Sequence, residues 1–196
     1  MPDHSDYFSA DQDPYLDPKT KILKNIPNLQ TQEELEKFEE VIFQVNSVEA
    51  TEYLKTCSTL GLEEWKRVHQ ICFADIFEWA GELRTIRIAK GSTVFAYPEN
   101  IEGEALKIFD EINLLLGSSK LTLDKTAELF AEANVLHPFR EGNGRTQRII
   151  FNEILRRIGR SVDYGLTDQH TMIEAMIHGY NANYEPVIKL FEKITL

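Results

Sequence analysis

A run of twelve residues in the second half of the chain constrains its fold most, because glycines and charges there interrupt two helical patterns. The run reads His137-Pro138-Phe139-Arg140-Glu141-Gly142-Asn143-Gly144-Arg145-Thr146-Gln147-Arg148. Gly142 and Gly144 allow positive φ and close approach to a ligand, so successive backbone N–H groups can converge on an anion; Asn143 also tolerates left-handed conformations. The run therefore predicts a phosphate-binding loop.

A helix is expected to begin at about Gly144, directly after this loop. Its buried face would carry apolar residues at helical spacing, namely Ile149, Ile150, Ile154, Leu155 and Ile158. Unpaired N–H groups and the helix dipole at such an N-terminus favour phosphate oxygens. Because Arg145 and Arg148 stand three residues apart, both guanidinium groups are expected to reach one polyphosphate.

Glu141 and His137 add chemistry to this anion site. A carboxylate would repel phosphate unless a cation lay between them, and Mg²⁺ commonly takes one or two carboxylates together with phosphates and water. An imidazole, with an unperturbed pKa of about 6.5, can accept a proton near neutral pH. Any one of these residues alone would be better explained as part of a helix cap with a solvated basic face; together they favour an active site.

The run resembles the signature of the Fic family, H-x-F-x-(D/E)-G-N-G-R-x-x-R. All eight specified positions match, which is more specific than a lone glycine-rich loop. The resemblance extends to residues 77–84 and, more weakly, to Asp13-Pro14-Tyr15-Leu16. It implies a protein adenylyltransferase, which moves AMP from ATP to a Ser, Thr or Tyr hydroxyl of a target protein and releases pyrophosphate.

The resemblance also implies a role for each motif residue. His137 would deprotonate the target hydroxyl, and Glu141 would hold Mg²⁺ on the α- and β-phosphates. The segment 142–144 and Arg145 would bind the phosphate chain, and Arg148 would orient the γ-phosphate. Phe139 would anchor the loop in the core, which is also what an aromatic residue between two loops does without any function.

Hydrophobic periodicity predicts an all-α fold with a small β-hairpin, and the resemblance implies that this is a single Fic-type helical domain with the hairpin as its flap. We expect a flexible N-terminal arm over residues 1–17 and the domain over 18–196, with its core at 62–160, the flap at 82–97 and the active-site loop at 137–145. Thr31-Gln32-Glu33-Glu34 has the spacing of a capping box. The helix that follows should bury Leu35, Phe38, Val41, Ile42 and Val45.

A second helix is expected after Gly61, with Trp65, Val68, Cys72, Ile76 and Trp79 at helical intervals. Later helices are expected at about 101–116 and 124–136, and from Thr167 or Asp168 to Tyr180. Pro186 suits the first turn of a last helix that ends near Ile194. In the Fic family this C-terminal region borders the adenine pocket, so the resemblance makes Tyr180 and Asn181 candidates for nucleotide binding.

The period changes to alternation between Glu82 and Tyr97. Residues 85–88 and 93–97, with a break at Gly91-Ser92, read as a β-hairpin. In the Fic family such a flap aligns an extended segment of the target by backbone pairing. By analogy Ile86, Ile88 and Phe95 would dock the target; an ordinary hairpin that covers the core is an equally good interpretation.

Composition limits the partners and the compartment. The 196 residues include 32 Asp and Glu against 21 Lys and Arg, a net charge of −11, which argues against nucleic acid or anionic membrane as a partner. Two cysteines and the absence of a leader or a long apolar run favour the cytoplasm. A zinc site from Cys57, His69 and Cys72 lacks a fourth ligand at recognisable spacing, so these residues are expected to be structural.

Many Fic proteins carry an inhibitory helix with the motif S/T-x-x-x-E-G/N, whose glutamate pairs with the second motif arginine. Here Glu precedes Gly or Asn only at Glu99, Glu102 and Glu141, and no Ser or Thr stands four residues before any of them. We therefore expect a stand-alone enzyme without its own inhibitory motif, the toxin half of a toxin–antitoxin pair whose small antitoxin supplies the glutamate in trans. The alternatives are an effector secreted into another cell, transfer of phosphate or another nucleotide, and a non-catalytic nucleotide-binding regulator.

Overall fold

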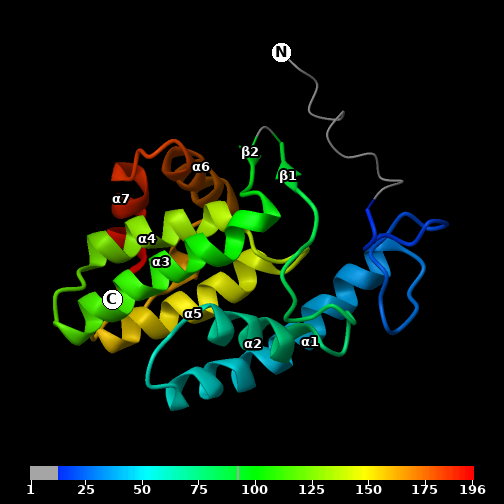
Figure 1. Cartoon of the computed structure of the whole chain (residues 1–196), viewed down its shortest axis with the longest axis horizontal. Helices are drawn as coiled ribbons and strands as arrows, with labels where there is room; N and C mark the ends of the chain where they lie inside the picture. The colour runs from blue at the N-terminus through cyan, green and yellow to red at the C-terminus, as the bar shows by residue number, and fades with distance from the viewer. Residues whose placement is uncertain (1–12, 92) are drawn as a thin grey trace.

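Seven α-helices and one short hairpin make up the part of the chain that this computed structural model describes, residues 13–91 and 93–196 (Figure 1). The helices are α1 (Gln32–Thr56), α2 (Leu62–Phe73), α3 (Pro98–Gly117), α4 (Leu123–Leu136), α5 (Asn143–Arg157), α6 (Gln169–Tyr180) and α7 (Glu185–Ile194). A 3-10 turn, η3 (Tyr164–Leu166), follows α5, and β1 (Ala89–Lys90) pairs antiparallel with β2 (Thr93–Val94). The expected all-α fold with a small hairpin is confirmed.

Helix α4 lies at the centre of the bundle and contacts α3, α5, α6 and α7 (Figure 1). Its residues Ala127, Leu129, Ala131 and Ala133 are buried, and small side chains let the neighbouring helices approach closely. On the other side of α5, α1 packs against α2 and α5. The active-site loop joins α4 to α5, so both of its ends are fixed by the core.

The start of α1 confirms the capping box. Of the predicted buried face, Leu35 is buried and Phe38 and Ile42 pack against the core, but the two valines are wrong. Thr31 Oγ1 accepts from the Glu34 N–H at 3.3 Å and donates to the Glu34 carboxylate at 2.9 Å. Val41 and Val45 are 60% and 66% exposed. The face that packs against α2 and α5 instead includes Glu39, whose charge is paired inside the fold, so a purely apolar pattern misplaced it.

Helix α2 ends at Phe73, six residues before the predicted end at Trp79. Beyond Phe73 the chain turns back, and Gly81 adopts φ +88° so that its N–H donates to Nδ1 of buried His69 at 2.9 Å. Trp79 still lies in the core. The helices after residue 97 begin and end close to the predicted positions, with the Asp168 side chain capping α6 and Pro186 in the first turn of α7.

Residues 13–25, which we call the strap, run along the domain surface. Asp13 forms an ion pair with Arg140 at 2.8 Å, and Leu16 bridges to Leu23. Residues 13–17, expected to be part of a flexible arm, therefore pack against the domain, and residues 1–12 of that arm lie outside the described part of the chain. Within the described ranges, no helix combines the length and the apolar character that crossing a bilayer requires.

Candidate active site

The end of α4 fixes the protonation pattern of His137. Its backbone is left-handed, with φ 42° and ψ 62°, and it caps the helix. Its Nδ1 lies 3.0 Å from the carbonyl oxygen of Asn134. A carbonyl can only accept, so Nδ1 carries the hydrogen and Nε2 keeps its lone pair. The imidazole is therefore oriented as a proton acceptor at Nε2.

The surroundings keep this imidazole neutral. The Phe95 ring stacks on His137 with centroids 3.7 Å apart and planes 15° apart. Burial lowers the pKa of His137 to about 4, although the bond to Asn134 and the charge of Glu141 favour the protonated form. Near neutral pH the ring is thus unprotonated, as a general base must be. Phe95, whose predicted role in docking the target stays a prediction, covers His137.

Phe139 and Asn143 close the loop that follows. Asn143 Oδ1 accepts from the Phe139 N–H, and its Nδ2 donates to the Phe139 carbonyl, both at 2.8 Å. Phe139 is fully buried, with its ring stacked 3.9 Å from His69 and edge-on to Trp65. The Asn143 side chain therefore stabilises the shape of the loop, and the phosphate binding predicted for Asn143 would have to come from its backbone N–H.

The backbone requires glycine at position 142 but not at position 144. Gly142 caps α5 at φ +78°, and a Cβ there would lie 2.5 Å from the Phe73 ring. Gly144 is the second residue of α5 and does not have positive φ, so the expectation of a left-handed backbone there is wrong. The helix begins one residue earlier than predicted, because Gly142 alone makes the turn. A Cβ at Gly144 would meet only the tip of Arg148, at 3.4 Å.

The two motif arginines point to different neighbours. Arg145 Nη2 lies 2.5 Å from the Glu39 carboxylate of α1 and 3.5 Å from that of Glu141. Its guanidinium also lies over the Phe73 ring at 4.7 Å. Arg148 instead lies 5.7 Å from the centroid of the Tyr164 ring in η3. Without a nucleotide the two guanidinium groups therefore have different partners, and their shared binding of one polyphosphate stays a prediction.

Arg148 carries an uncompensated charge. It has no carboxylate partner within residues 13–91 and 93–196, and burial lowers the pKa of its guanidinium from the usual value without discharging it at neutral pH. Arg145, by contrast, shares its charge with Glu39, a residue of α1 that sequence reasoning missed. Of the two, Arg148 is the one ready to receive an anion.

Glu141 has the exposure that a metal ligand needs. Its side chain is 45% exposed, and Oε1 accepts from the Gly142 N–H at 2.9 Å, which leaves Oε2 open. No group of three or more acidic, cysteine or histidine side chains gathers in the described part of the chain. One open carboxylate suits Mg²⁺ bound mainly by substrate phosphates and water, and does not suit a preformed cage of protein ligands.

Arg84, to which the sequence pattern gave no role, ties the flap to the active-site loop. Its guanidinium donates to four carbonyl oxygens: those of His137 at 2.8 Å, Ile86 at 2.6 Å, Ala96 at 2.5 Å and Leu136 at 3.1 Å. Two of these carbonyls, those of Ile86 and Ala96, lie in the predicted strands and bond to Arg84 there. The β-ladder is therefore two residues long on each side, at 89–90 and 93–94, and the predicted strands 85–88 and 93–97 are wrong in extent.

His69 supports the loop from α2. Its Nδ1 accepts from Gly81, so Nε2 carries the hydrogen and donates to the Glu141 carbonyl at 3.0 Å. Burial lowers the pKa of His69 to about 3 and raises that of the Cys72 thiol to about 12. With both ring nitrogens bonded to backbone groups, His69 has no lone pair for zinc. The sequence signal for this contact is the segment 77–84, which resembles the family outside the motif and contains Gly81, the donor to His69.

The remaining predicted residues lie away from His137 or at its border. Ile86 and Ile88, in the first half of the flap, are half-buried. Tyr180 is 38% exposed at the end of α6, and the Asn181 side chain donates to the Ile177 carbonyl at 2.8 Å. Their link to a nucleotide stays a prediction.

Known proteins resemble the chain in sequence and in fold. The pattern of the Fic/DOC family matches residues 59–155. "Probable protein adenylyltransferase y4lH" of Sinorhizobium fredii is 36% identical over 92% of this chain and 94% of its own length. "Probable protein adenylyltransferase Fic" of Escherichia coli is 30% identical over 97% of this chain and 96% of its own.

Solved structures agree with the fold. The N-terminal Fic domain of a VirB-translocated Bep effector from Bartonella quintana superimposes with a TM-score of 0.81 at 24% identity, covering 92% of this chain and 91% of that domain. The N-terminal Fic domain of a Bep effector from Bartonella quintana with bound ADP superimposes with a TM-score of 0.78 at 24% identity, covering 93% of this chain and 94% of that domain. BepC of Bartonella tribocorum, with bound AMPPNP, gives 0.76 at 22% identity and covers 93% and 96%.

The fold and the loop together define a helical domain that presents the N-terminus of α5 next to a neutral histidine. With the relatives above, the assignment is direct: the chain belongs to the Fic/DOC family. The relatives that match it over almost their whole length are named protein adenylyltransferases.

Proposed function

We propose that this chain is a protein adenylyltransferase that moves AMP from ATP to a Ser, Thr or Tyr hydroxyl of a target protein. The observation that carries the proposal is the orientation of His137. Its Nδ1 is committed to the Asn134 carbonyl, so its free Nε2 is a base held beside the N-terminus of α5. Binding an anion alone would need neither this base nor Glu141.

In the proposed reaction, His137 Nε2 takes the proton of the target hydroxyl while the hydroxyl oxygen bonds to the α-phosphorus. The bond between the α-phosphorus and the oxygen that bridges to the β-phosphorus breaks, and pyrophosphate leaves. The backbone N–H groups of 142–144 and the Arg145 guanidinium bind the phosphate chain, and Arg148 takes the γ-phosphate. Catalysis rests mainly on position and on charge stabilisation. Tyr180 and Asn181 are proposed to border the adenine.

Mg²⁺ is the proposed metal, held by Glu141. The open Oε2 of Glu141 and its half-exposed side chain fit a hard cation that also binds phosphate oxygens. Bound there, the ion would neutralise the negative charge of the triphosphate. Without it, the Glu141 carboxylate would repel the same phosphates.

The flap is proposed to align the target. Its β1 residues are exposed, and each strand has one ladder edge without a partner strand in the described sheet. An extended target segment can therefore add to the flap by backbone pairing, with Ile86 and Ile88 beneath it. Phe95 is proposed to contact the target segment from the side of His137, whose ring it covers.

Regulation is proposed to come from another protein, an antitoxin. Arg148 has no carboxylate partner in the described residues, whereas Glu39 pairs with Arg145 and Asp13 with Arg140. A glutamate from a small partner would bind Arg148 and compete with the γ-phosphate. We propose the cytoplasm as the compartment; secretion as an effector is the alternative.

Transfer of label from ATP to the proteins of a cell lysate tests the enzymatic proposal. With Mg²⁺, ATP labelled at the α-phosphorus should label target proteins, and ATP labelled at the γ-phosphorus should not. His137→Ala should lower the rate by at least about 100-fold, whereas His170→Ala, at an exposed histidine of α6, should leave it unchanged. Label from the γ-position would indicate phosphate transfer, and nucleotide binding without any label would indicate a regulator. Either result would reject the proposed transfer of AMP.

A further inference from the structure

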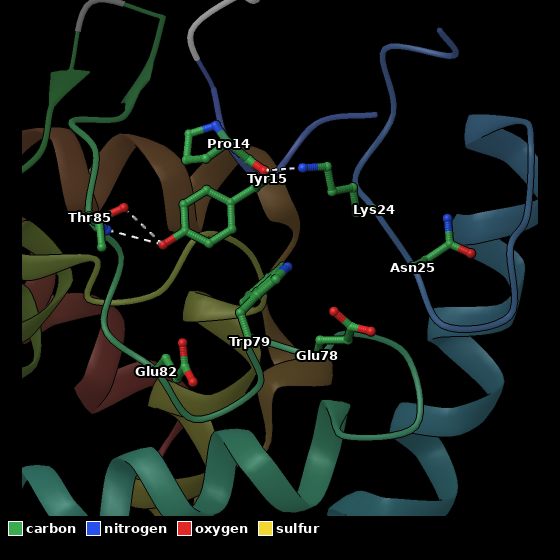
Figure 2. Close-up of a pocket in the computed structure, with 8 residues that line it drawn as sticks. All are labelled: Pro14, Tyr15, Lys24, Asn25, Glu78, Trp79, Glu82 and Thr85. Carbon is green, nitrogen blue, oxygen red and sulfur yellow. Dashed lines mark hydrogen bonds between the residues drawn. The ribbon is translucent and has the colours of Figure 1, made fainter. Parts of the chain in front are cut away.

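A hollow of about 570 Å³ lies between the strap and the segment that leads into the flap (Figure 2). Pro14 and Tyr15 of the strap form one side, and Glu78, Trp79 and Glu82 form the other. None of these residues belongs to the loop that carries His137. The hollow is therefore separate from the proposed nucleotide site.

Two aromatic rings form a wall of the hollow. Tyr15 and Trp79 meet edge to face, with centroids 5.4 Å apart. The Tyr15 hydroxyl oxygen accepts from the Thr85 N–H at 3.1 Å, which fixes the wall to the first part of the flap (Figure 2). The Phe77 ring stacks on Trp79 with centroids 4.4 Å apart, so Tyr15 is the ring of this wall on which a flat cation can stack.

The indole N–H of Trp79 has no acceptor. Trp79 is only 9% exposed, and its Nε1 is buried without a hydrogen-bond partner in the described structure. Figure 2 shows this nitrogen on the ring edge that faces the space between Lys24 and Asn25. Trp65, the other tryptophan, donates to Thr146 at 3.1 Å. A buried donor without an acceptor is unfavourable, so the hollow suits an occupant that brings an acceptor oxygen.

The charge of the hollow is negative. The carboxylates of Glu78 and Glu82 line it, and neither has a hydrogen bond or an ion pair within residues 13–91 and 93–196. The one cation among the lining residues is Lys24, whose ammonium donates to the Pro14 carbonyl at 2.7 Å. Two unpaired carboxylates against one ammonium that is already bonded favour a cationic occupant.

We propose that the hollow binds an arginine side chain of the target protein, an inference that rests on the function proposed above. A guanidinium is planar, so it can stack on the half-buried Tyr15 ring, which Trp79 supports edge to face, while it donates to Glu78 and Glu82. A backbone carbonyl of the same segment supplies the acceptor for the Trp79 N–H. Lysine fits less well, because its compact ammonium cannot stack or bond in a fork.

The hollow borders the active-site loop through two contacts. Asp13, next to Pro14 in the strap, pairs with Arg140 of the loop at 2.8 Å. Thr85 follows Arg84, which bonds to the His137 carbonyl. A target segment that lies along the flap can therefore place an arginine in the hollow and a hydroxyl near His137. The hollow then adds a sequence preference to the backbone pairing at the flap.

Peptide titration of the ¹⁵N-labelled chain tests this inference without nucleotide. The chain has two tryptophans, so its spectrum has two indole N–H resonances, which Trp79→Phe assigns. The probe is a blocked pentapeptide with one arginine between pairs of glycines. It should shift the Trp79 resonance to saturation and leave that of Trp65 in place. The same peptide with citrulline, which has the shape of arginine without its charge, should bind at least about 5-fold more weakly.

Charge-removing variants complete the test. Glu78→Gln combined with Glu82→Gln should weaken the arginine peptide about 5-fold or more, as the loss of two exposed ion pairs predicts. Glu192→Gln, at an exposed position of α7, should bind as the unaltered chain does. An unmoved Trp79 resonance, or equal binding of the arginine and citrulline peptides, would overturn the inference. Because no ATP is present, these results do not depend on whether AMP transfer takes place.

Discussion

The ring of Phe95 lies face to face with that of His137, with centroids 3.7 Å apart. Phe95 is 7% exposed and comes from the end of the flap, so the segment proposed to align the target also shields the proposed base. Shielding disfavours the imidazolium, and the pKa of His137 is lowered to about 4. The flap therefore favours the neutral form of the proposed base, in addition to its proposed role in aligning the target.

Removal of this shield should change the pH dependence of the reaction. AMP transfer needs neutral His137, so the rate of the unaltered chain should be constant near neutral pH and fall only as the pH approaches about 4. Phe95→Ala admits water, which stabilises the imidazolium and raises the pKa toward the ordinary value of about 6.5. The fall should then begin at a higher pH.

Titration of His137 by NMR, together with a pH–rate profile, measures this shift. Phe95→Leu is the matched control, because leucine keeps an apolar cover over the imidazole and should keep most of the lowered pKa. An unchanged pKa of His137 in Phe95→Ala would contradict a shielding role for the flap.

Substitution of the two glycines should have opposite effects on stability. Gly142→Ala places a methyl group 2.5 Å from the Phe73 ring at φ +78°, so it should destabilise the fold by about 1–3 kcal/mol and weaken nucleotide binding. Gly144→Ala has ordinary helical backbone and should be neutral or stabilise by up to about 1 kcal/mol. Urea unfolding measures both changes, and equal losses in the two variants would show that the turn does not depend on Gly142.

Arg84→Lys should loosen the flap. Lysine keeps the charge but cannot bond to four carbonyls in a fork, so buried carbonyls of Ile86, Ala96 and Leu136 would lose their donor. A loss of at least about 2 kcal/mol in the free energy of unfolding is expected, with faster proteolysis within residues 85–97. Arg160→Lys, at an exposed position, is the control. Unchanged stability of Arg84→Lys would show that the carbonyl bonds contribute little.

Glu39→Gln should tighten ATP binding. The Glu39 carboxylate lies 2.5 Å from Arg145 and offsets the positive charge that the phosphates would meet. An uncharged amide keeps the shape and removes the repulsion, so KM for ATP should fall roughly 2- to 5-fold. Glu33→Gln, on the exposed side of α1, should leave KM unchanged. A rise in KM for Glu39→Gln would instead mean that Glu39 holds Arg145 in its binding position.

The sequence alone determined the features that local chemistry decides. Helix ends followed from the Thr31 and Asp168 caps and from Pro186, because capping and fixed φ depend on a few neighbouring residues. The twelve-residue loop was recognisable for the same reason: its residue types stand at fixed spacing.

Only the tertiary structure decided which groups the loop residues meet. Glu39 is 106 residues from Arg145, and Arg84 is 53 residues from His137, so no local pattern joins them. The length of the flap strands was misjudged because Arg84 takes carbonyls that a strand pattern assigns to the ladder, and Phe95 covers His137 because the flap folds onto α4. Contacts between distant segments depend on how the helices pack, which periodicity along the chain does not specify.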